Sequence, residues 1–503
     1  MKKQTKLTKQ ERWTKGRIAG CISVFIFNVV LMICIFALSI YLNGIGFNAV
    51  AVGFNEYFNH LSAQFIYLSI TLVLILFVTF AFLFFEDRKF IQSPANIEMI
   101  FLIIEVTVVC SYLSGRYINI YFRPLALGAL LTLLLVNRRT AIFMNTVTSL
   151  IIFLMDVFTN ANFASSASEF AQYSSLIIGF TTGILGVYLI DGVGARLKVL
   201  IRGCIMIIPE LICLVLLEQT NLLKHYERLL AGASAAILSV VLFMAILPVF
   251  ETIFKKLTNY KLAELTEHSS PLVKRMIEQA PGTFNHSLVV SNLAESCAIG
   301  IGENALLARC AAYYHDMGKL KQPEFFKENQ NEGRNPHNDI TPELSANIIK
   351  AHTKDGYEIL KKHRLPQEIC DICLQHHGTM PILFFYAKAK TFADGGDVDI
   401  ERYSYQGPKP QTKIAAIIMI CDAGEAAARS LTERSRENVD KAIAKIVNER
   451  MVLGQFDDCD ITMMELNIIR NTIVNSLTGV YHKRIEYPKV NLEDFKTEES
   501  YNG

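Results

Sequence analysis

The chain has 503 residues, 51% of them hydrophobic, and its mean hydropathy is +0.30. A positive mean is unusual for a soluble globular protein and indicates segments that cross a membrane. The formal net charge is only +2, which excludes the strong basic field of most nucleic-acid-binding proteins, so we expect no DNA or RNA partner. The eleven cysteines are scattered without a disulfide pattern, which favours a reducing compartment for the second half of the chain.

The first half of the chain is predicted to be a transmembrane helical bundle. A helix needs about 20 apolar residues to cross a bilayer, and eight segments within residues 18–250 approach that length. The segments are Ile18–Leu42, Phe65–Phe85, Ile97–Ser114, Tyr121–Val136, Ala141–Phe158, Tyr173–Ile190, Val199–Leu217 and Leu229–Phe250.

The orientation follows from the lysines and arginines, which concentrate in cytoplasmic loops of membrane proteins. They gather in residues 1–17 and in the alternate connections at Arg88–Lys89, Arg138–Arg139 and Arg196–Arg202. We therefore predict a cytoplasmic N-terminus, and an even number of spans returns the C-terminal half to the cytoplasm. The protein is thus expected to be a multi-pass protein of the lipid bilayer.

Two carboxylates, Glu105 and Glu210, lie deep within predicted spans. Ionisable groups are costly there and are functional candidates, for ligand binding or for signal transmission. The favoured interpretation is structural, because polar side chains often bond to a neighbouring helix inside a membrane bundle.

After Phe250 the sequence becomes polar with a helical period. Residues 251–280 are predicted to form connecting cytoplasmic helices, residues 281–486 a compact helical domain, and residues 487–503 a polar tail. The segment Ala393–Pro410 is rich in glycine, aspartate, proline and tyrosine and is predicted to be a long loop. Convincing strand patterns are absent, so the predicted fold class is all-α, with a transmembrane bundle followed by a helical cytoplasmic domain.

Seven side chains that can bind metal ions recur along these helices. They are His286, His315, Asp316, His352, His376, His377 and Asp422. Imidazole and carboxylate together suit divalent iron, manganese, cobalt, nickel or zinc. Seven ligands are too many for one ion with open positions, but they suit two ions that share a bridging carboxylate, for which Asp316 is the candidate. Two ions suit phosphoester hydrolysis, because they generate hydroxide at neutral pH and neutralise charge on the phosphoryl and leaving oxygens.

Lys319 is the second candidate catalytic residue beside Asp316. Lys319 lies about one helical turn after Asp316, in the sequence HDMGK. From there its ammonium group could contact the substrate phosphate. Gly318 is expected to let the backbone turn sharply.

Three further residues are candidates for weaker roles near the predicted centre. Glu425 and Arg429 are predicted to form an ion pair that supports the metal ligand Asp422, rather than to act in catalysis. His337 is interpreted as an ordinary loop histidine, with substrate contact as the alternative.

The order of the ligands (H, HD, H, HH, D) is similar to that of the HD-domain metal phosphohydrolases. The surrounding segments are more specific: they include NHSLVVSNLAESCAIGIGENALLARCAAYYHDMGKLKQPEFFKENQ, NPHNDITPELSANIIKAHTKDGYEILKKHRLP, QHHGTMPILFFYAKAK and GPKPQTKIAAIIMICDAGEAAARSL. They resemble the PgpH-type cyclic-di-AMP phosphodiesterases of the seven-transmembrane-receptor HD family. The sequence resemblance is strong over Ser270–His482. In the membrane half the resemblance lies in the architecture, a series of membrane spans that precedes the HD domain.

The resemblance implies a bacterial enzyme of the cytoplasmic membrane that hydrolyses cyclic di-AMP to pApA with two ions, Mn²⁺ or Fe²⁺. By motif, the family's ligands correspond to the seven residues above, and a homodimer is compatible with the receptor architecture. Family members usually carry a large extracellular domain after the first span, whereas here only Asn43–Gln64 separates the first two spans. Tyr403–Tyr405 and the FFYAK segment are the candidates for stacking on the adenine bases.

Other functions remain open at this point. A cyclic-di-GMP phosphodiesterase of the HD-GYP kind would carry GYP shortly after the histidine pair, and HHGTMPILFFYAKAK contains none. Another HD nucleotide phosphohydrolase is a weaker alternative, because such enzymes are generally soluble. An alternative of a different class is a membrane receptor whose HD domain binds a nucleotide as a signal.

Overall fold

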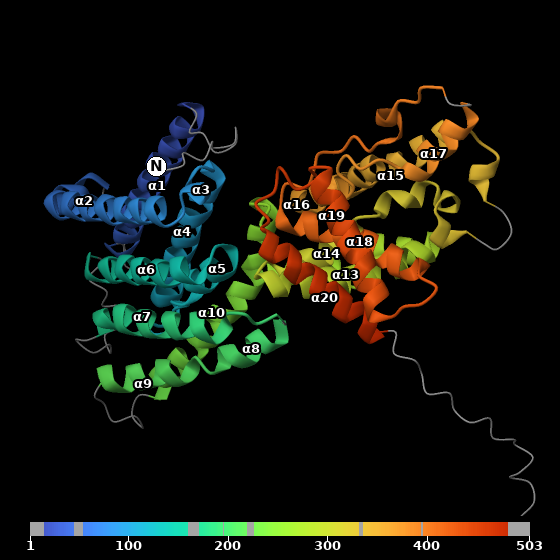
Figure 1. Cartoon of the computed structure of the whole chain (residues 1–503). Helices are drawn as coiled ribbons and strands as arrows, with labels where there is room; N and C mark the ends of the chain where they lie inside the picture. The colour runs from blue at the N-terminus through green and yellow to red at the C-terminus, as the bar shows by residue number, and fades with distance from the viewer. Residues whose placement is uncertain are drawn as a thin grey trace, which may run out of the picture. The chain divides into compact units, whose positions relative to one another are not determined.

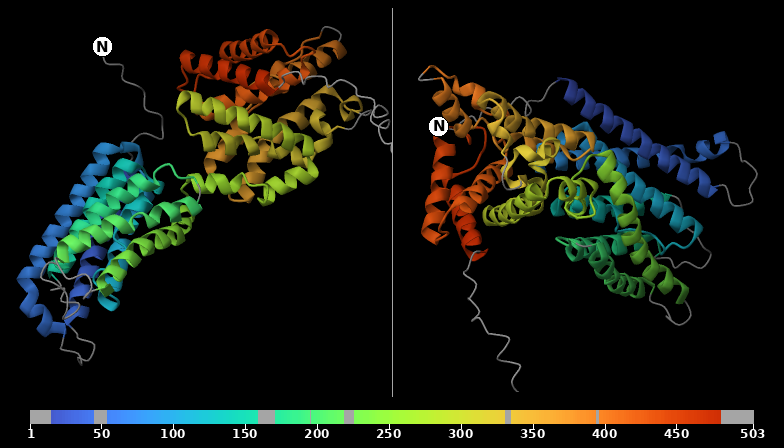
Figure 2. Two further views of the ribbon diagram at one scale, coloured as in Figure 1. Left: turned by 90° about the horizontal axis from the view of Figure 1, so that it is seen from below. Right: turned by 90° about the vertical axis from the view of Figure 1, so that its right-hand side faces the viewer.

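The computed structural model describes residues 15–44, 54–158, 171–194, 196–218, 226–330, 335–393 and 396–480. Among these residues every regular element is a helix, apart from one isolated bridge between Pro381 and Ser404 (Figures 1 and 2). The predicted all-α fold class is therefore confirmed. The polar tail 487–503 and most of the basic N-terminal segment 1–17 lie outside the described residues.

The chain divides into two compact units, Met1–Lys261 and Leu262–Gly503. The division falls inside the predicted connecting segment 251–280, and the other predicted domain limits stay predictions.

The first unit is a helical bundle. Its elements are α1 (Lys15–Gly44), α2 (Phe54–Glu86), α3 (Arg88–Ile91), α4 (Pro94–Tyr117), α5 (Leu127–Leu135), α6 (Arg138–Phe158), α7 (Ala171–Ile190), α8 (Arg196–Cys204), α9 (Ile207–Glu218), α10 (Tyr226–Ile253) and α11 (Asn259–Leu265), which runs into the second unit. Within the described residues, seven segments are helical, long and apolar enough to cross a membrane. This agrees with the prediction of a multi-pass membrane protein, while the orientation of its termini stays a prediction.

The predicted span Tyr121–Val136 is wrong as a continuous helix, because only Leu127–Leu135 is helical. Pro124 explains the break, since proline lacks an N–H group and disfavours helical backbone in the preceding residue. The segment still runs along α6: Arg123 binds Asp156 near the end of α6, and α6 begins just after the segment, at Arg138. The irregular stretch is buried in the bundle, which is where non-helical backbone is tolerated at membrane depth.

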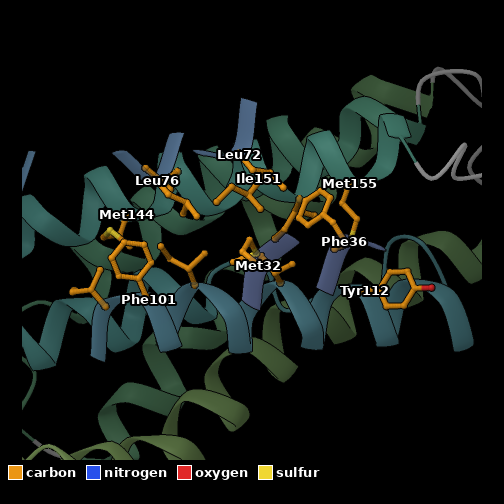
Figure 3. Close-up of a cluster of buried hydrophobic side chains, with 14 of the residues drawn as sticks. Met32, Phe36, Leu72, Leu76, Phe101, Tyr112, Met144, Ile151 and Met155 are labelled. Atoms are coloured by element: carbon orange, nitrogen blue, oxygen red, sulfur yellow. The ribbon is translucent and has the colours of Figure 1, made fainter. Parts of the chain in front are cut away.

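Helices α1 and α4 run parallel and are joined along their length. Asn28 donates a hydrogen bond to Glu98 Oε2 (2.8 Å), and Tyr112 donates one to the Ser39 carbonyl (3.0 Å). Apolar side chains of α1, α2, α4 and α6 pack together in one buried cluster that joins these four helices (Figure 3). The first predicted span is therefore an integral part of the bundle. Glu105 and Glu210 are both buried within the same unit, and their roles stay predictions.

The second unit is a compact helical domain. Its α-helices are α12 (Pro271–Gln279), α13 (Pro281–Ile301), α14 (Ala305–Tyr314), α15 (Pro342–Lys362), α16 (Gln367–Gln375), α17 (Leu383–Phe392), α18 (Lys413–Ser430), α19 (Arg436–Val452) and α20 (Met463–Val480). Short 3-10 helices lie at Met317–Lys321 (η1), Pro323–Phe325 (η2), Lys327–Asn329 (η3), Pro336–Asn338 (η4) and Ile400–Tyr403 (η5).

Local sequence sets the ends of these helices. The side chains of Asn304, Thr341, Thr412 and Ser435 each accept a hydrogen bond from a backbone N–H in the first turn of the helix that follows. Gly302 ends α13 with a φ of 76°, a left-handed conformation that favours glycine. Apolar faces of α13, α14, α18, α19 and α20 form the core of this domain. That core fixes the helices that carry the candidate site.

The ion pair between Arg123 and Asp156 gives a testable prediction. Both side chains are 2% exposed, so Asp156→Ala would leave a buried charge without its partner. We expect the free energy of unfolding to fall by about 3 kcal/mol. As a control, Asp191→Ala removes the exposed partner of Arg138 and should cost less than about 1 kcal/mol. Thermal unfolding of the purified chain in detergent measures both, and equal effects would contradict the prediction.

Candidate metal centre

The structure brings all seven predicted metal ligands together, although they come from five different helices or helix ends. His286 lies in α13, His352 in α15 and Asp422 in α18, while His315 and Asp316 follow α14 and the pair His376–His377 follows α16. The ligand atoms form two groups, each within 4.8 Å. One group is His352, His376 and His377; the other is His286, His315, Asp316 and Asp422.

The buried carboxylate of Asp316 lies between the two groups. Its Oδ2 is 3.2 Å from His315 Nε2 and 3.7 Å from His286 Nε2. Its Oδ1 is 3.4 Å from His352 Nε2 and 3.7 Å from His376 Nε2. One oxygen faces each group, which is the arrangement that a carboxylate bridging two ions requires.

The protonation of the histidines shows that this donor set suits metal ions. In His315, His352 and His376, Nδ1 lies 2.6 to 2.7 Å from the backbone carbonyl three residues earlier. A carbonyl only accepts hydrogen bonds, so Nδ1 carries a proton in all three rings. Burial lowers the pKa of His352 and of His376, so these two rings are neutral and their Nε2 atoms present lone pairs to the centre. The Nε2 atoms of His352 and His376 lie 3.2 Å apart. Two facing lone pairs repel each other unless a cation lies nearby, so the residues fit bound divalent ions.

One buried polar atom supports the same interpretation. Among the described residues, His315 Nε2 forms no hydrogen bond. Buried polar atoms are rarely left unsatisfied, and coordination of a metal ion would satisfy this one.

The two groups differ in their electrostatics. Burial lowers the pKa of His377 to about 3 and holds that of His376 well below its ordinary value. Burial also acts to lower the pKa of His315, but the Asp316 and Asp422 carboxylates outweigh it and raise the pKa to about 10. The three-histidine group is therefore neutral at neutral pH, whereas the other group contains the two carboxylates that offset the charge of bound cations.

Lys319 lies at the edge of this centre. Its Nζ is 2.7 Å from Asp316 Oδ2 and 2.6 Å from Glu328 Oε1. Burial opposes its charge, but these carboxylates raise the pKa of Lys319 above its ordinary value, so the ammonium form persists. Glu328 was not predicted from the sequence, although it lies near the end of the first segment that resembles the family, in KENQ.

The loop that carries Glu328 is fixed to the start of α13. Asn329 Oδ1 accepts a hydrogen bond from Thr283 N (3.2 Å), and Asn329 Nδ2 donates one to Thr283 Oγ1 (2.8 Å). A Cβ at Gly282 would lie 1.9 Å from the Glu328 carbonyl oxygen, so only glycine permits this approach. The loop is thereby held one turn away from His286.

Gly318 is needed for packing rather than for a special backbone angle. The chain turns here into the 3-10 helix η1, but Gly318 does not adopt a positive φ. A Cβ at this position would lie 1.9 Å from the His352 carbonyl oxygen and 2.6 Å from Gly356 N. The HDMGK segment therefore packs directly on the backbone of α15, which brings Asp316 close to His352.

The ion pair of Glu425 and Arg429 forms, but it supports a different ligand from the one predicted. Glu425 Oε2 is 2.6 Å from His286 Nδ1, and Glu425 Oε1 accepts a hydrogen bond from Arg429 Nε (3.0 Å). Because α13 packs against α18, this carboxylate reaches His286 across the interface. It fixes the ring so that Nε2 points toward Asp422 Oδ1, at 3.0 Å.

The aromatic candidates for base stacking are mostly buried. The ring of Tyr405 stacks on His377, with centroids 4.4 Å apart, and Tyr403 packs in an apolar cluster with Phe385. His337 is also buried, and its ring lies against Phe385. These residues position the centre and its surroundings, whereas Phe384 of the FFYAK segment is 70% exposed.

A cavity of about 360 Å³ opens beside the centre. Its walls include the proposed ligands His286 and Asp422, the basic residues Lys319, Lys327 and Arg429, and the carboxylates Glu328 and Glu425, which pair with Lys319 and Arg429. The size lies within the range of small-molecule sites, and Lys327 together with ions at the proposed centre would attract an anionic ligand.

The contact between Glu425 and His286 gives a second prediction. In Glu425→Ala the imidazole loses the acceptor that orients it, so we expect the affinity for Mn²⁺ to fall about 10- to 100-fold. Titration of the metal-free chain with Mn²⁺, followed by electron paramagnetic resonance, measures the change. Glu449→Ala is the matched control, because it removes a surface carboxylate that pairs with Lys445 outside both ligand groups. An unchanged affinity in Glu425→Ala would refute the supporting role.

Comparison with known proteins agrees with the resemblance found in the sequence. Residues 64–258 match the family described as 7TM receptor with intracellular HD hydrolase, and residues 283–427 match the HD domain. The cyclic-di-AMP phosphodiesterase PgpH of Listeria monocytogenes is 40% identical over 418 residues, which are 82% of this chain and 53% of the relative. The protein of that name from Bacillus subtilis is 38% identical over 394 residues, 77% of this chain and 54% of the relative.

The chain thus spans about half the length of these curated relatives. The L. monocytogenes PgpH HD domain, solved by crystallography in complex with cyclic di-AMP, is 51% identical in sequence to this chain. The match covers 43% of this chain and 100% of that chain, with a TM-score of 0.41. The membrane half and the HD half of the chain are thus both similar to 7TM receptors with an intracellular HD hydrolase.

Proposed function

We propose that this chain is a membrane-bound, metal-dependent phosphodiesterase that hydrolyses cyclic di-AMP to pApA. The observation that carries the proposal is the convergence of six other potential metal-binding side chains around Asp316, beside a cavity whose walls include Lys319, Lys327 and Arg429. Such a site suits a small anionic substrate with a phosphoester bond.

The proposed metal ligands are His286, His315, Asp316, His352, His376, His377 and Asp422. Imidazole and carboxylate donors suit Mn²⁺ or Fe²⁺, which are the ions we propose. Two such ions would lower the pKa of a water molecule and neutralise charge on the phosphoryl oxygens.

The chain's own residues would perform the remaining tasks of the reaction. Asp316 holds the two halves of the centre together, and its contact with Lys319 fixes an ammonium group beside the cavity. A phosphate bound at the centre would meet this positive charge, which stabilises the extra negative charge of the transition state. We therefore propose Asp316 and Lys319 as the catalytic residues, with Glu328 holding Lys319 in position.

The choice of substrate is supported by the relatives. Both are named cyclic-di-AMP phosphodiesterases, and the aligned region contains more than three quarters of this chain. The alternative substrate, cyclic di-GMP, lacks support from the sequence, because no GYP follows the histidine pair.

The location of the enzyme follows from the same proposal. We place the HD domain, residues 281–486, on the cytoplasmic side of a bacterial plasma membrane together with the N-terminus, as the basic connections predict. A homodimer stays compatible with this arrangement.

A hydrolysis assay on the full chain in detergent, with Mn²⁺ supplied, tests the function. We expect cleavage of cyclic di-AMP to pApA, a loss of about 1,000-fold or more in His315→Ala and Asp316→Ala, and full loss after chelation that added Mn²⁺ reverses. His363→Ala is the control, because this exposed histidine lies outside both ligand groups.

Cyclic di-GMP is assayed beside cyclic di-AMP with the same preparations. If the chain cleaves cyclic di-GMP but not cyclic di-AMP, the proposed substrate is wrong and cyclic di-GMP takes its place. Cyclic-di-AMP cleavage that persists in both ligand variants would contradict the proposed site.

A further inference from the structure

We propose that Lys327 binds the second phosphate of the dinucleotide, the one that is not being cleaved. This inference rests on the proposed function, since it assumes a substrate with two phosphodiester groups. Lys327 would then determine specificity: it would favour a cyclic dinucleotide over a molecule with one phosphodiester.

The first argument is the position of Lys327 in the cavity. Its walls include the ligands His286 and Asp422, so a phosphate at the metal centre would border this space. Lys327 lines the same cavity but is not among the grouped metal-ligating side chains. A molecule that fills the cavity from the centre outward therefore meets the side chain of Lys327.

The second argument is the balance of charge among the three basic residues of the cavity. Lys319 is compensated by Asp316 and Glu328, and Arg429 is bound to Glu425. No carboxylate of the described residues forms an ion pair with Lys327, whose side chain is exposed. Of the three, Lys327 therefore has the positive charge that is most available for a ligand.

The third argument is that the backbone of Lys327 is fixed. The residue begins η3, and the two following residues are held against α13: Glu328 by the close approach of Gly282, and Asn329 by two hydrogen bonds with Thr283. Helix α13 also carries His286. The base of the lysine side chain is thus held at a set position relative to the metal centre, unlike that of a lysine in a loose surface loop.

The chemistry of the substrate completes the argument. In a cyclic dinucleotide the ring joins two phosphodiesters, and only one of them can occupy the centre at a time. The other keeps a full negative charge that is buried on binding and requires a cationic partner. A lysine ammonium provides this charge and tolerates several geometries of approach, because it acts as a point charge with rotatable donors.

The test compares two substrates on the full chain in detergent with Mn²⁺. Cyclic di-AMP has two phosphodiesters, and bis(p-nitrophenyl) phosphate has one. In Lys327→Ala we expect KM for cyclic di-AMP to rise about tenfold, as loss of one charge-assisted hydrogen bond predicts. We expect kcat for cyclic di-AMP, and both kcat and KM for bis(p-nitrophenyl) phosphate, to stay within about twofold of the wild type. In Lys327→Arg we expect KM for cyclic di-AMP to return close to the wild-type value.

Lys445→Ala is the matched control, since it removes one positive charge from the surface of α19, where the lysine pairs with Glu449. The proposal is overturned if KM for cyclic di-AMP is unchanged in Lys327→Ala, or if both substrates are affected equally. A wild-type chain that cleaves bis(p-nitrophenyl) phosphate but not cyclic di-AMP would refute the proposed substrate, and the inference with it. Cleavage of cyclic di-AMP with a normal KM in Lys327→Ala would refute the inference alone.

Discussion

The candidate site depends on one buried carboxylate. Asp316 directs one oxygen toward each of two groups of ligands, so the helices that carry those groups must all approach within a few ångströms of it. Without cations the centre buries the facing Nε2 lone pairs of His352 and His376. Ions bound at the proposed site would offset this cost, so metal binding would stabilise the folded domain.

Close backbone approach makes this convergence possible. Gly318 touches the backbone of α15 and Gly282 touches the loop of Glu328, and neither position has room for a Cβ. Side-chain packing alone would hold these segments farther apart. The two glycines therefore set the positions of Asp316 and Lys319 as much as the residues that contact the centre directly.

Much of the architecture could be predicted from the sequence. Long apolar segments revealed the membrane bundle, and the seven ligands were recognisable because their residue types suit few purposes other than metal binding when they occur together. The family resemblance supplied the proposed substrate, which the spacing of the seven side chains alone does not indicate.

Two of the errors share a physical cause: contacts between residues of different elements have no local signal in the sequence. Glu328 meets Lys319 nine positions away through a series of short 3-10 turns, and Glu425 meets His286 across 139 residues of sequence. The break in the segment 121–136 was visible in principle at Pro124, but its apolar composition resembled that of a complete span.

Helix α18 connects two parts of the centre rigidly. It carries both the ligand Asp422 and, one turn later, the carboxylate that orients His286 of α13. A small rotation or axial shift of α18 would displace both together and would also disturb the apolar core that it shares with α13 and α20. The centre would then lose its geometry in a single cooperative step rather than ligand by ligand.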